Sequence, residues 1–348
     1  MAYNNMAEQK QNITHVSIPY TLYGLLHYLL LFDDDIVFNH THYFLTDTSN
    51  AKIREALHAT YFQSSFGTDF RSRIKRKIVK IKYVLSRRKY PFLKTAAIFA
   101  NGSVSSLWIG NRSYSLLADA PDSLTHNMNE DSLEWKRQQL KWNKLSGKIE
   151  ALIYGKPMLL YLGNNNQCTD IYLTEQNFSP VLKGKRVHVE SLESLWNKAS
   201  EQKKDFILQL FDINEETKKI LSSKPLWFFT QPFTTDAKMT DEEYALLLQK
   251  IIDKYGESNL LIKLHPRDKF NYKQFFPNIT IFDKRVNMQL LILAHLLPQK
   301  AVAICTGAID CLPETVELDW LGAGVHDKVL SFFGDSICPH RKYQSVKL

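Results

Sequence analysis

Short apolar runs alternate with amphipathic stretches along this chain, and the alternation is clearest after residue 225. In that half we expect strands at the apolar runs 226–230, 260–264, 280–282 and 301–305. Residues 241–255 and 288–297 have helical spacing, and 329–333 is a last apolar segment. Thr240 and Glu243 have the spacing of a capping box at the start of the first helix. Strands alternating with helices predict a parallel sheet with crossover helices.

The N-terminal half repeats this pattern. We expect strands at 13–17, 37–45, 96–100, 106–109, 115–117 and 157–162, and helices at 22–31, 51–61 and 134–147. A polar stretch rich in lysine and glutamate separates the two halves. The pattern predicts an α/β protein with two Rossmann-like domains whose parallel sheets face a central cleft. The domains are expected at 13–190 and 226–335, with a helical connector at 191–225.

The net charge of +8 comes from one segment. Residues 71–89 hold ten Lys or Arg and no acid, so the rest of the chain has 34 basic and 36 acidic residues. An apolar stripe runs along this segment at helical spacing, formed by Ile74, Ile78, Ile81 and Leu85. Such a helix suits an anionic membrane surface. The alternatives are a helix that docks on its own domain through the stripe, and a nucleic-acid contact.

Several classes of protein do not fit the sequence. No run of about 18 apolar residues indicates a transmembrane helix. The first eleven residues are polar and lack the core of a signal peptide, so we expect a cytoplasmic protein. The P-loop, the dinucleotide fingerprint and the nucleophile elbow are all absent. The four cysteines show no CxxC pairing, which predicts reduced thiols rather than a zinc site. Residues 33–35 are three aspartates that suit either a divalent metal or an ordinary loop.

Polar clusters follow three of the expected strands in the C-terminal half. They are Thr230-Gln231-Pro232 with Asp236 nearby, His265-Pro266-Arg267-Asp268, and Cys305-Thr306-Gly307. Because the carboxyl ends of parallel strands share one edge of a sheet, we expect these clusters to lie together. Hydroxyls, a glycine-flanked backbone, histidine and arginine all suit a phosphate group. The alternative for His265 is a hydrogen-bonded structural histidine at a strand end.

Three of these strings carry a resemblance to a known family. They are Thr230-Gln231-Pro232-Phe233, the stretch from Lys263 to Lys269, and Ala303-Ile304-Cys305-Thr306-Gly307. With the early Ile18-Pro19-Tyr20-Thr21-Leu22, the chain resembles glycosyltransferase family 52, the bacterial lipooligosaccharide sialyltransferases and related enzymes. The resemblance spans roughly residues 13–335 and is strongest from 226 to 310. It implies a GT-B-like fold and a metal-independent, inverting transfer of sialic acid from CMP-sialic acid to a terminal sugar of a glycolipid. It also suggests a homodimer.

The resemblance implies roles for individual residues. His265 matches the histidine that contacts the CMP phosphate and assists the departure of the leaving group. Thr306 matches small hydroxyl residues that hold the phosphate, and Gln289 falls where relatives contact the ribose. Lys263 and Arg267 are expected to set a positive local field. The full set expected to bind the donor is Thr230, Gln231, Lys263, Pro266, Arg267, Gln289, Thr306 and Gly307.

The catalytic base is the open point of the sequence. Many bacterial sialyltransferases carry an acid-acid-Gly motif in the N-terminal domain, and residues 115–120 match it best, with only Asp119 as an acid. Asp236 and Asp241 are alternatives in the C-terminal half. Two other functions stay open. The chain is either a transferase of the same fold that uses another nucleotide sugar or a polyol phosphate, or an inactive protein that binds a glycan or nucleotide.

Overall fold

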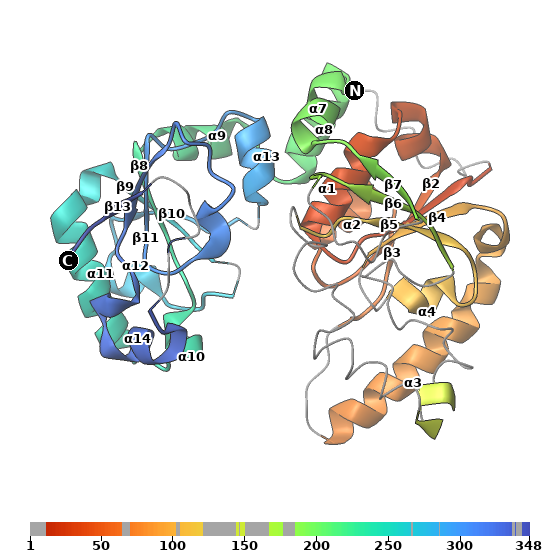
Figure 1. Cartoon of the computed structure of the whole chain (residues 1–348), viewed down its shortest axis with the longest axis horizontal. Coiled ribbons are helices and arrows are strands. Elements are labelled where there is room, and N and C mark those ends of the chain that lie inside the picture. Colours follow the sequence, from red (N-terminus) through yellow and green to blue (C-terminus); the bar gives the residue numbers. More distant parts are fainter. Residues whose placement is uncertain are drawn as a thin grey trace. The chain divides into compact units, whose positions relative to one another are not determined.

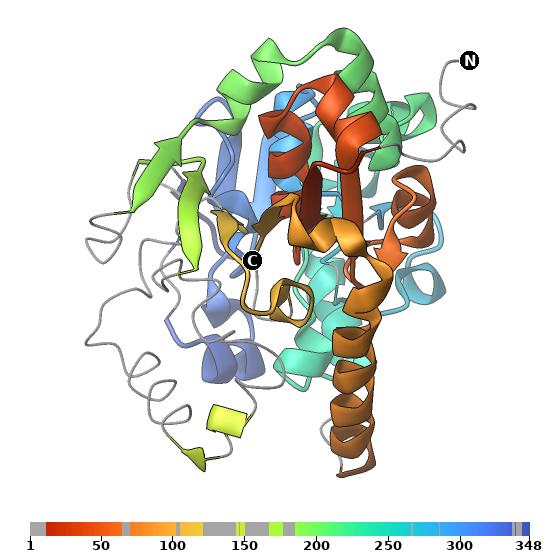
Figure 2. The ribbon, with the colours of Figure 1, turned by 90° about the vertical axis from the view of Figure 1, so that its right-hand side faces the viewer.

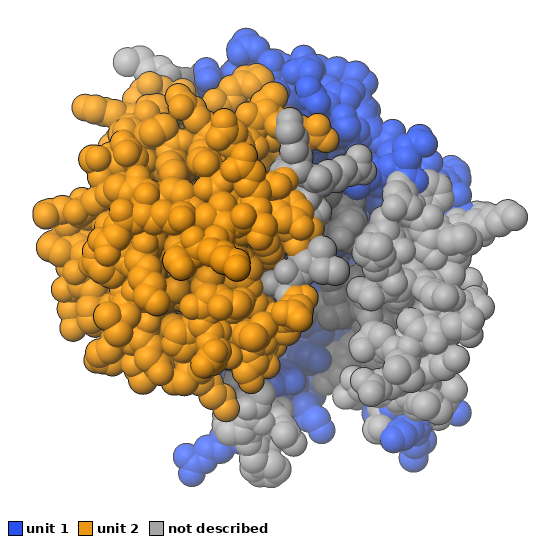
Figure 3. All heavy atoms as spheres, turned by 60° about the vertical axis from the view of Figure 1, so that its left-hand side comes forward, with its two compact units in different colours: residues 1–210 blue, residues 211–348 orange. Residues whose placement is uncertain are grey.

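The computed structural model divides the chain into two compact units, residues 1–210 and 211–348 (Figure 3). It describes residues 12–64, 70–101, 105–120, 144–145, 147–149, 167–176, 185–265, 267–284, 286–335, 338 and 343–348. The boundary at 210/211 falls inside the stretch where a helical connector was expected. Of the expected elements, the strand 157–162 and most of the helix 134–147 lie outside the described residues.

The described part of unit 1 contains a sheet of seven parallel strands in the order β3-β2-β1-β4-β5-β6-β7. They are β1 (His15–Ile18), β2 (Thr41–Leu45), β3 (Thr60–Tyr61), β4 (Ala97–Ala100), β5 (Tyr114–Leu117), β6 (Cys168–Leu173) and β7 (Arg186–Val189). The order 3-2-1-4-5-6 is that of a doubly wound Rossmann sheet, with one strand added. The topological switch point, where consecutive crossovers change direction, lies between β1 and β4.

Helices cover both faces of this sheet (Figures 1 and 2). Its helices and helical turns are α1 (Leu22–Leu31), η1 (Ile36–His40), α2 (Ala51–Ala56), α3 (Phe70–Ser86), η2 (Arg87–Lys89), η3 (Pro91–Lys94), α4 (Ser106–Ile109), α7 (Leu192–Lys198) and α8 (Glu201–Leu210). Tyr28 of α1 contacts Tyr43 on β2, whereas Trp108 of α4 stacks on the next residue, Phe44, at 4.1 Å between ring centroids. Successive strand side chains point to opposite faces, so α1 and α4 lie on opposite sides of the sheet.

Unit 2 has a second parallel sheet with the same order of strands. Its six described strands run β10-β9-β8-β11-β12-β13, with the switch point between β8 and β11. They are β8 (Leu226–Phe229), β9 (Leu260–Lys263), β10 (Thr280–Phe282), β11 (Lys300–Ala303), β12 (Glu317–Trp320) and β13 (Gln344–Ser345). Every residue of β8 and β9 is buried, as expected for central strands covered on both faces.

The helices of unit 2 carry clear start signals. They are α9 (Glu215–Ser222), α10 (Phe233–Asp236), α11 (Asp241–Tyr255), α12 (Tyr272–Phe275), α13 (Met288–Leu293) and α14 (Asp327–Phe333), with 3-10 turns η7 (Glu257–Asn259), η8 (Gly307–Ile309) and η9 (Ala323–Val325). The capping box of Thr240 and Glu243 is present at α11, and Gly256 ends that helix with φ 82°. Leu248 and Ile251 of α11 belong to the core that holds Phe228 and Ile262. The expected helices 22–31 and 241–255 are confirmed with those bounds.

Two expected strands of unit 1 are wrong in whole or in part. Residues 106–109 form the helix α4, which Gly110 ends at φ 63°. A four-residue apolar run has no periodicity that separates a strand from a buried helical turn. Residues 36–40 form the π-helical turn η1, and only the second half of the expected strand 37–45 is β2. The side-chain hydroxyl of Thr41 donates to the carbonyl of Ile36 at 2.8 Å, which closes that turn.

Two expected helices end earlier than the sequence indicated. The helix 51–61 stops at Ala56, because His58 takes a left-handed conformation at φ 48° and Thr60–Tyr61 pair with β2. The helix 288–297 stops at Leu293, followed by His295 at φ 55°. In addition, the last expected segment, 329–333, lies in the helix α14.

The basic segment forms the helix α3, and the alternative in which it docks on its own domain through the apolar stripe is wrong, because Ile78, Ile81 and Leu85 are exposed. Tyr83 packs against Trp108 and Phe62, and its hydroxyl accepts a hydrogen bond from the backbone of Gln63 at 2.7 Å. The guanidinium of Arg87 donates to the carbonyls of Ser106 and Leu107. Within the residues that the structure describes, no helix is both long and apolar enough to cross a membrane.

Candidate functional site

The candidate site lies at the carboxyl edge of the unit 2 sheet, at its topological switch point. Thr230 directly follows β8, and Thr306 follows β11, the neighbouring strand across the switch point. Chain connections leave these two strands in opposite directions, and the carboxyl ends of such a pair are where open α/β sheets bind ligands. Sequence alone suggested one shared edge, and the strand order puts two of the three polar clusters on the two strands at the switch point.

Hydrogen bonds join the three polar clusters. The hydroxyl of Thr230 accepts a hydrogen bond from the backbone N–H of His265 at 2.9 Å, and the backbone N–H of Thr230 donates to the carbonyl of Lys263 at 3.1 Å. The amide Nε2 of Gln231 reaches across the switch point to the carbonyl of Cys305 at 3.4 Å. The ends of β8, β9 and β11 are therefore tied together by side chains that the sequence had marked as candidates.

The imidazole of His265 is half-buried and oriented by its own loop. The backbone N–H of Arg267 donates to Nδ1 of His265 at 3.1 Å, so Nδ1 must be unprotonated in this arrangement. The proton of the neutral ring then lies on Nε2, which becomes a hydrogen-bond donor. Burial and the positive charge of Arg267 lower the pKa of His265. His265 is thus set up as a neutral donor at neutral pH.

Arg267 and Asp236 form a two-point ion pair. Nη1 and Nη2 of Arg267 lie 3.1 and 2.9 Å from the two carboxylate oxygens of Asp236. The Asp236 side chain is 16% exposed, whereas that of Arg267 is 63% exposed. Asp236 is therefore committed to positioning the guanidinium, whose outer side still faces solvent. Asp268 is also committed, because it accepts hydrogen bonds from the hydroxyl of Tyr272 at 2.6 Å and from the backbone of Phe270 at 3.1 Å.

Lys263, the last residue of β9, places an ammonium group inside the protein at this edge. Its side chain is 7% exposed, and Nζ lies 5.2 Å from the centroid of the Phe282 ring on the neighbouring strand. Burial lowers the pKa of Lys263 to about 8, against the opposing effect of Asp283. A charged amine held in a poorly solvated place is strongly attracted to an added anion.

The loop after β11 offers backbone rather than charge. The hydroxyl of Thr306 accepts from the backbone N–H of Ala308 at 3.2 Å and starts the turn η8. A Cβ atom placed on Gly307 would meet no other atom within 4 Å, so the space above this glycine is open. Gln289 is the second residue of α13, and its backbone N–H donates to the side chain of Asn287 at 2.8 Å. Pro266 lies outside the described residues.

Asp119, a candidate base, belongs to unit 1. It follows β5 and is half-buried, and its carbonyl accepts a hydrogen bond from the hydroxyl of Thr21 at 3.1 Å. Asn101, which sequence reasoning did not select, lies at the switch point of this sheet. Its amide accepts from the backbone of Tyr20 and donates to the carbonyl of Ala118. A polar residue directly after the apolar run 96–100 was the available signal, the same signal that marked Thr230.

The remaining candidates have structural explanations. Asp241 is exposed and opens the helix α11, where a carboxylate offsets the positive end of the helix dipole. Asp34 pairs with Lys203 at 2.9 Å, and Asp35 lies 3.2 Å from Nε2 of His40. Among the residues described, no group of three His, Cys, Asp or Glu side chains is arranged to hold a metal ion. No disulfide bond joins any two of the four cysteines, all of which lie in the described part of the chain.

Comparisons with known proteins give one family and one fold. The model of glycosyltransferase family 52 matches residues 27–306. An uncharacterized protein of Haemophilus influenzae is 33% identical over 165 residues, which is 47% of this chain and 54% of that protein. The chain thus spans about half the length of this curated relative.

Solved bacterial sialyltransferases share the fold over nearly the whole chain. The α/β-galactoside α-2,3-sialyltransferase of Photobacterium phosphoreum has a TM-score of 0.55 at 12% identity, covering 95% of this chain and 98% of that one. A sialyltransferase of Photobacterium damsela has a TM-score of 0.56 at 13% identity, covering 95% and 81%. The GT-B domain of a Photobacterium damselae sialyltransferase gives 0.51 at 11% identity, covering 92% and 96%. The expected α/β fold of GT-B type is confirmed.

Proposed function

This chain belongs to glycosyltransferase family 52, and from that premise we propose that it transfers a sugar from a nucleotide-sugar donor to a glycan acceptor. The donor that fits best is CMP-sialic acid, and the acceptor is a terminal sugar of a bacterial surface glycan such as lipooligosaccharide or capsule. The observation that carries the proposal is the edge of the unit 2 sheet. There His265, Thr306 and Gly307 offer a neutral N–H donor, a hydroxyl and open backbone, groups that suit a phosphate.

The proposed reaction is an inverting displacement. A carboxylate takes the proton of the acceptor hydroxyl while that oxygen bonds to the anomeric carbon of the donor sugar. The bond from this carbon to the phosphate oxygen breaks, and the electron pair leaves with the nucleotide. Nε2–H of His265 donates to the departing phosphate oxygen, where negative charge develops. Because Nδ1 accepts the backbone N–H of Arg267, the histidine serves as a preorganised donor rather than as a cationic acid.

Positive charge at the edge supports transfer without a metal ion. The buried ammonium of Lys263 and the guanidinium of Arg267 offset phosphate charge in the way that a divalent cation does in other transferases. We therefore expect donor turnover to persist in the presence of a chelator. Thr230 and Gln231 hold the strand ends in place, and Gln289 is proposed to contact the ribose.

For the base we favour Asp119 over the other two candidates. Asp236 is held in a two-point ion pair by Arg267, and Asp241 is an exposed residue at the start of a helix. Asp119 is a half-buried residue at the carboxyl edge of a Rossmann-type sheet.

We further propose that the chain works in the cytoplasm on the inner face of the bacterial inner membrane, where lipid-linked acceptors are made, and that it forms a homodimer.

Donor hydrolysis tests the proposal. The purified chain is incubated with CMP-sialic acid and, separately, with UDP-sugars and a CDP-linked polyol, all with chelator, and the nucleotide released is measured. Release of CMP supports a sialyltransferase. Release of another nucleotide keeps the transferase and changes the donor, and retained CMP binding without release from any donor would favour an inactive binding protein.

The proposed role of the histidine has its own variants. Replacing His265 by Ala removes the Nε2–H donor and should lower the turnover number about 100-fold or more. His265→Gln places an amide N–H close to the position of Nε2 and should recover part of that loss. If His265→Ala turns over within a few-fold of the parent, the histidine does not assist the leaving group.

A further inference from the structure

The helix α3 of unit 1 presents a surface that the proposed transfer reaction does not use. It has 17 residues, which corresponds to a length of about 25 Å. Figures 1 and 2 both show α3 extending away from the sheet of unit 1, with its N-terminal end farthest from the sheet. Tyr83 of α3 packs against Trp108, and Arg87, just after the end of α3, donates to the carbonyl of Leu107. Both contacts lie near the C-terminal end of the helix.

The apolar stripe lies on the face of α3 opposite to Tyr83. Successive residues of an α-helix are about 100° apart, which places Ile78, Ile81 and Leu85 together and roughly opposite the docked tyrosine. Their side chains are 62%, 43% and 58% exposed, respectively. Three exposed isoleucine and leucine side chains along one helix face differ from the single, scattered apolar residues of an ordinary protein surface. The side chain of Ile74, the fourth member of the stripe, is not among those described.

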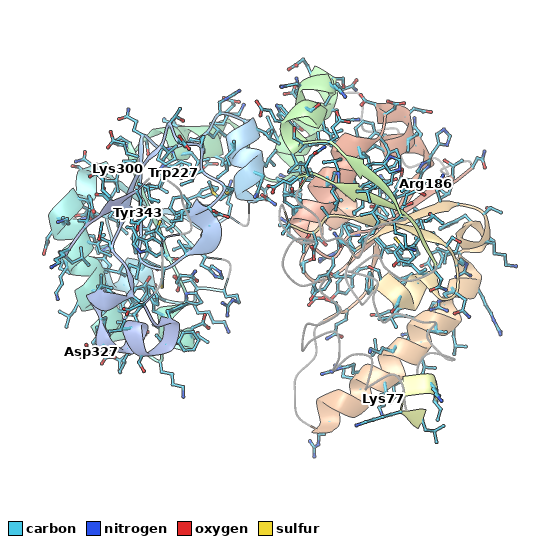
Figure 4. The ribbon with its side chains drawn as sticks, viewed as in Figure 1. Lys77, Arg186, Trp227, Lys300, Asp327 and Tyr343 are labelled. Atoms are coloured by element: carbon cyan, nitrogen blue, oxygen red, sulfur yellow. The ribbon has the colours of Figure 1, made fainter. Side chains whose placement is uncertain are left out.

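Basic side chains flank this stripe on both sides. Lys75 and Lys82 lie along one side by helical geometry, Lys77 lies along the other, and all three are exposed. Figure 4 labels Lys77 on the outer part of α3. Long lysine side chains at the border of an apolar face can extend their ammonium groups toward lipid headgroups while their methylenes stay on apolar surface.

We propose that this face of α3, formed by Ile78, Ile81, Leu85, Lys75, Lys77 and Lys82, docks on the surface of an anionic lipid bilayer. The helix lies in the plane of the headgroups, with the stripe inserted between them and the lysines beside phosphate groups. The charge distribution fits this partner. Residues 71–89 carry ten positive charges and no negative one, and the rest of the chain has a slight negative excess.

Two other partners fit the same face less well. A second copy of α3 packed along the stripe would bring ten positive charges against ten more, which is unfavourable. A nucleic acid would engage the lysines but would leave three large apolar side chains in contact with a charged backbone. A bilayer accepts both the apolar stripe and the charges that flank it.

The experiment measures binding to vesicles, which does not depend on transfer activity. The full chain is floated with vesicles of phosphatidylcholine alone and with vesicles that also contain phosphatidylglycerol. We expect binding to the anionic vesicles only, weakened by salt. Lys75→Glu/Lys77→Glu/Lys82→Glu should reduce partitioning at least about 100-fold, since each basic residue near an anionic surface contributes about fivefold. Ile78→Ser/Ile81→Ser/Leu85→Ser should reduce it roughly tenfold or more with no change in charge.

A control variant separates the local surface from the net charge. Lys219→Glu/Lys250→Glu/Lys347→Glu changes the net charge by the same amount at three exposed positions of unit 2, and it should bind vesicles nearly as well as the parent. Equal loss in this control and in the α3 charge variant overturns the proposal, and so does equal binding of the parent to neutral vesicles. If the serine variant keeps full vesicle binding, the stripe does not insert into the bilayer and the proposal is wrong. The proposal is also wrong if the serine variant changes the oligomer mass measured by light scattering, because the stripe is then a contact with another protein chain. Turnover of soluble donor stays at the parent level in all three variants, so loss of docking and failure of the transferase proposal are told apart.

Discussion

The ion pair between Arg267 and Asp236 makes a prediction that decides between two roles for a carboxylate. If Asp236 only positions the guanidinium, Asp236→Asn weakens its contact with Arg267, and about two thirds of the Arg267 side chain is exposed to solvent. Exposed ion pairs contribute about 1 kcal/mol or less, and the two-point geometry puts this pair at the upper end. We therefore expect kcat/KM to fall by no more than about tenfold. Loss of a catalytic base would cost about 100- to 10,000-fold.

A double-mutant cycle sharpens this comparison. Asp236→Asn, Arg267→Gln and the double variant are assayed for donor turnover and for unfolding in urea, with Glu242→Gln, an exposed acid in the first turn of α11, as the matched control. In the positioning role, the double variant turns over about as fast as Arg267→Gln alone, because the carboxylate acts only through the guanidinium. The unfolding measurements should give a coupling energy of about 0.5–1 kcal/mol.

The opposite outcome refutes the reasoning. If Asp236→Asn is nearly inactive with either arginine or glutamine at position 267, the losses multiply and Asp236 acts on the substrate directly. The ion pair would then describe only a resting arrangement, and the preference for Asp119 as the base would be wrong.

Three further variants test the energetics of both units. Lys263→Met removes a buried charged group whose pKa is lowered from 10.5 to about 8, and the cost of burying that charge is fully present below pH 8. The free energy of unfolding at neutral pH should therefore rise by up to about 3 kcal/mol, while the dissociation constant of the donor increases. Unchanged donor binding would exclude Lys263 from the site. Gly307→Ala should leave stability within about 1 kcal/mol, because the new Cβ meets nothing within 4 Å, but should weaken donor binding at least about tenfold if the phosphate occupies that space. His27 is fully buried, burial lowers its pKa to about 4 from 6.5, and the described residues offer its Nδ1 no hydrogen-bond partner. As the pH falls from 6.5 to 4, the histidine therefore takes up a proton in the unfolded chain before it does so in the folded chain. Between about pH 7.5 and 4.5, the free energy of unfolding measured in urea should fall by about 2.5 kcal/mol more for the parent than for His27→Leu.

The sequence predicted the candidate edge because a strand end is a local event. At Thr230, His265 and Thr306 an apolar run stops at polar residues, and each of these positions follows a strand in the structure. Parallel strands share their carboxyl edge, so the sequence alone predicts that the three clusters lie on one edge. The helix α11 was equally local, since its capping box and its final glycine both stand within the segment itself.

What the sequence could not supply depends on partners far away in the chain. Arg267 and Asp236 are 31 residues apart, and no local pattern indicates that their side chains meet. The stripe of α3 illustrates the same limit. An amphipathic period shows that one face is apolar, but it does not show which face packs on the rest of the unit. Tyr83 packs against Trp108 and Arg87 donates to carbonyls of α4, so these contacts hold the face opposite to the apolar stripe.

The two units share one strand order but provide different chemistry at their carboxyl edges. Unit 2 places hydrogen-bond donors and buried or exposed cations there, and the carboxylates of Asp236 and Asp268 already accept hydrogen bonds from protein groups. Such an edge suits a bound anion and is poorly suited to taking up a proton, because nearby cations and donors make a carboxylate less basic. In unit 1 a carboxylate, that of Asp119, follows the strand β5. The inverting transfer that we propose needs a base as well as a stabilised leaving group, and this difference in chemistry is the physical reason to seek the base outside the edge that holds His265.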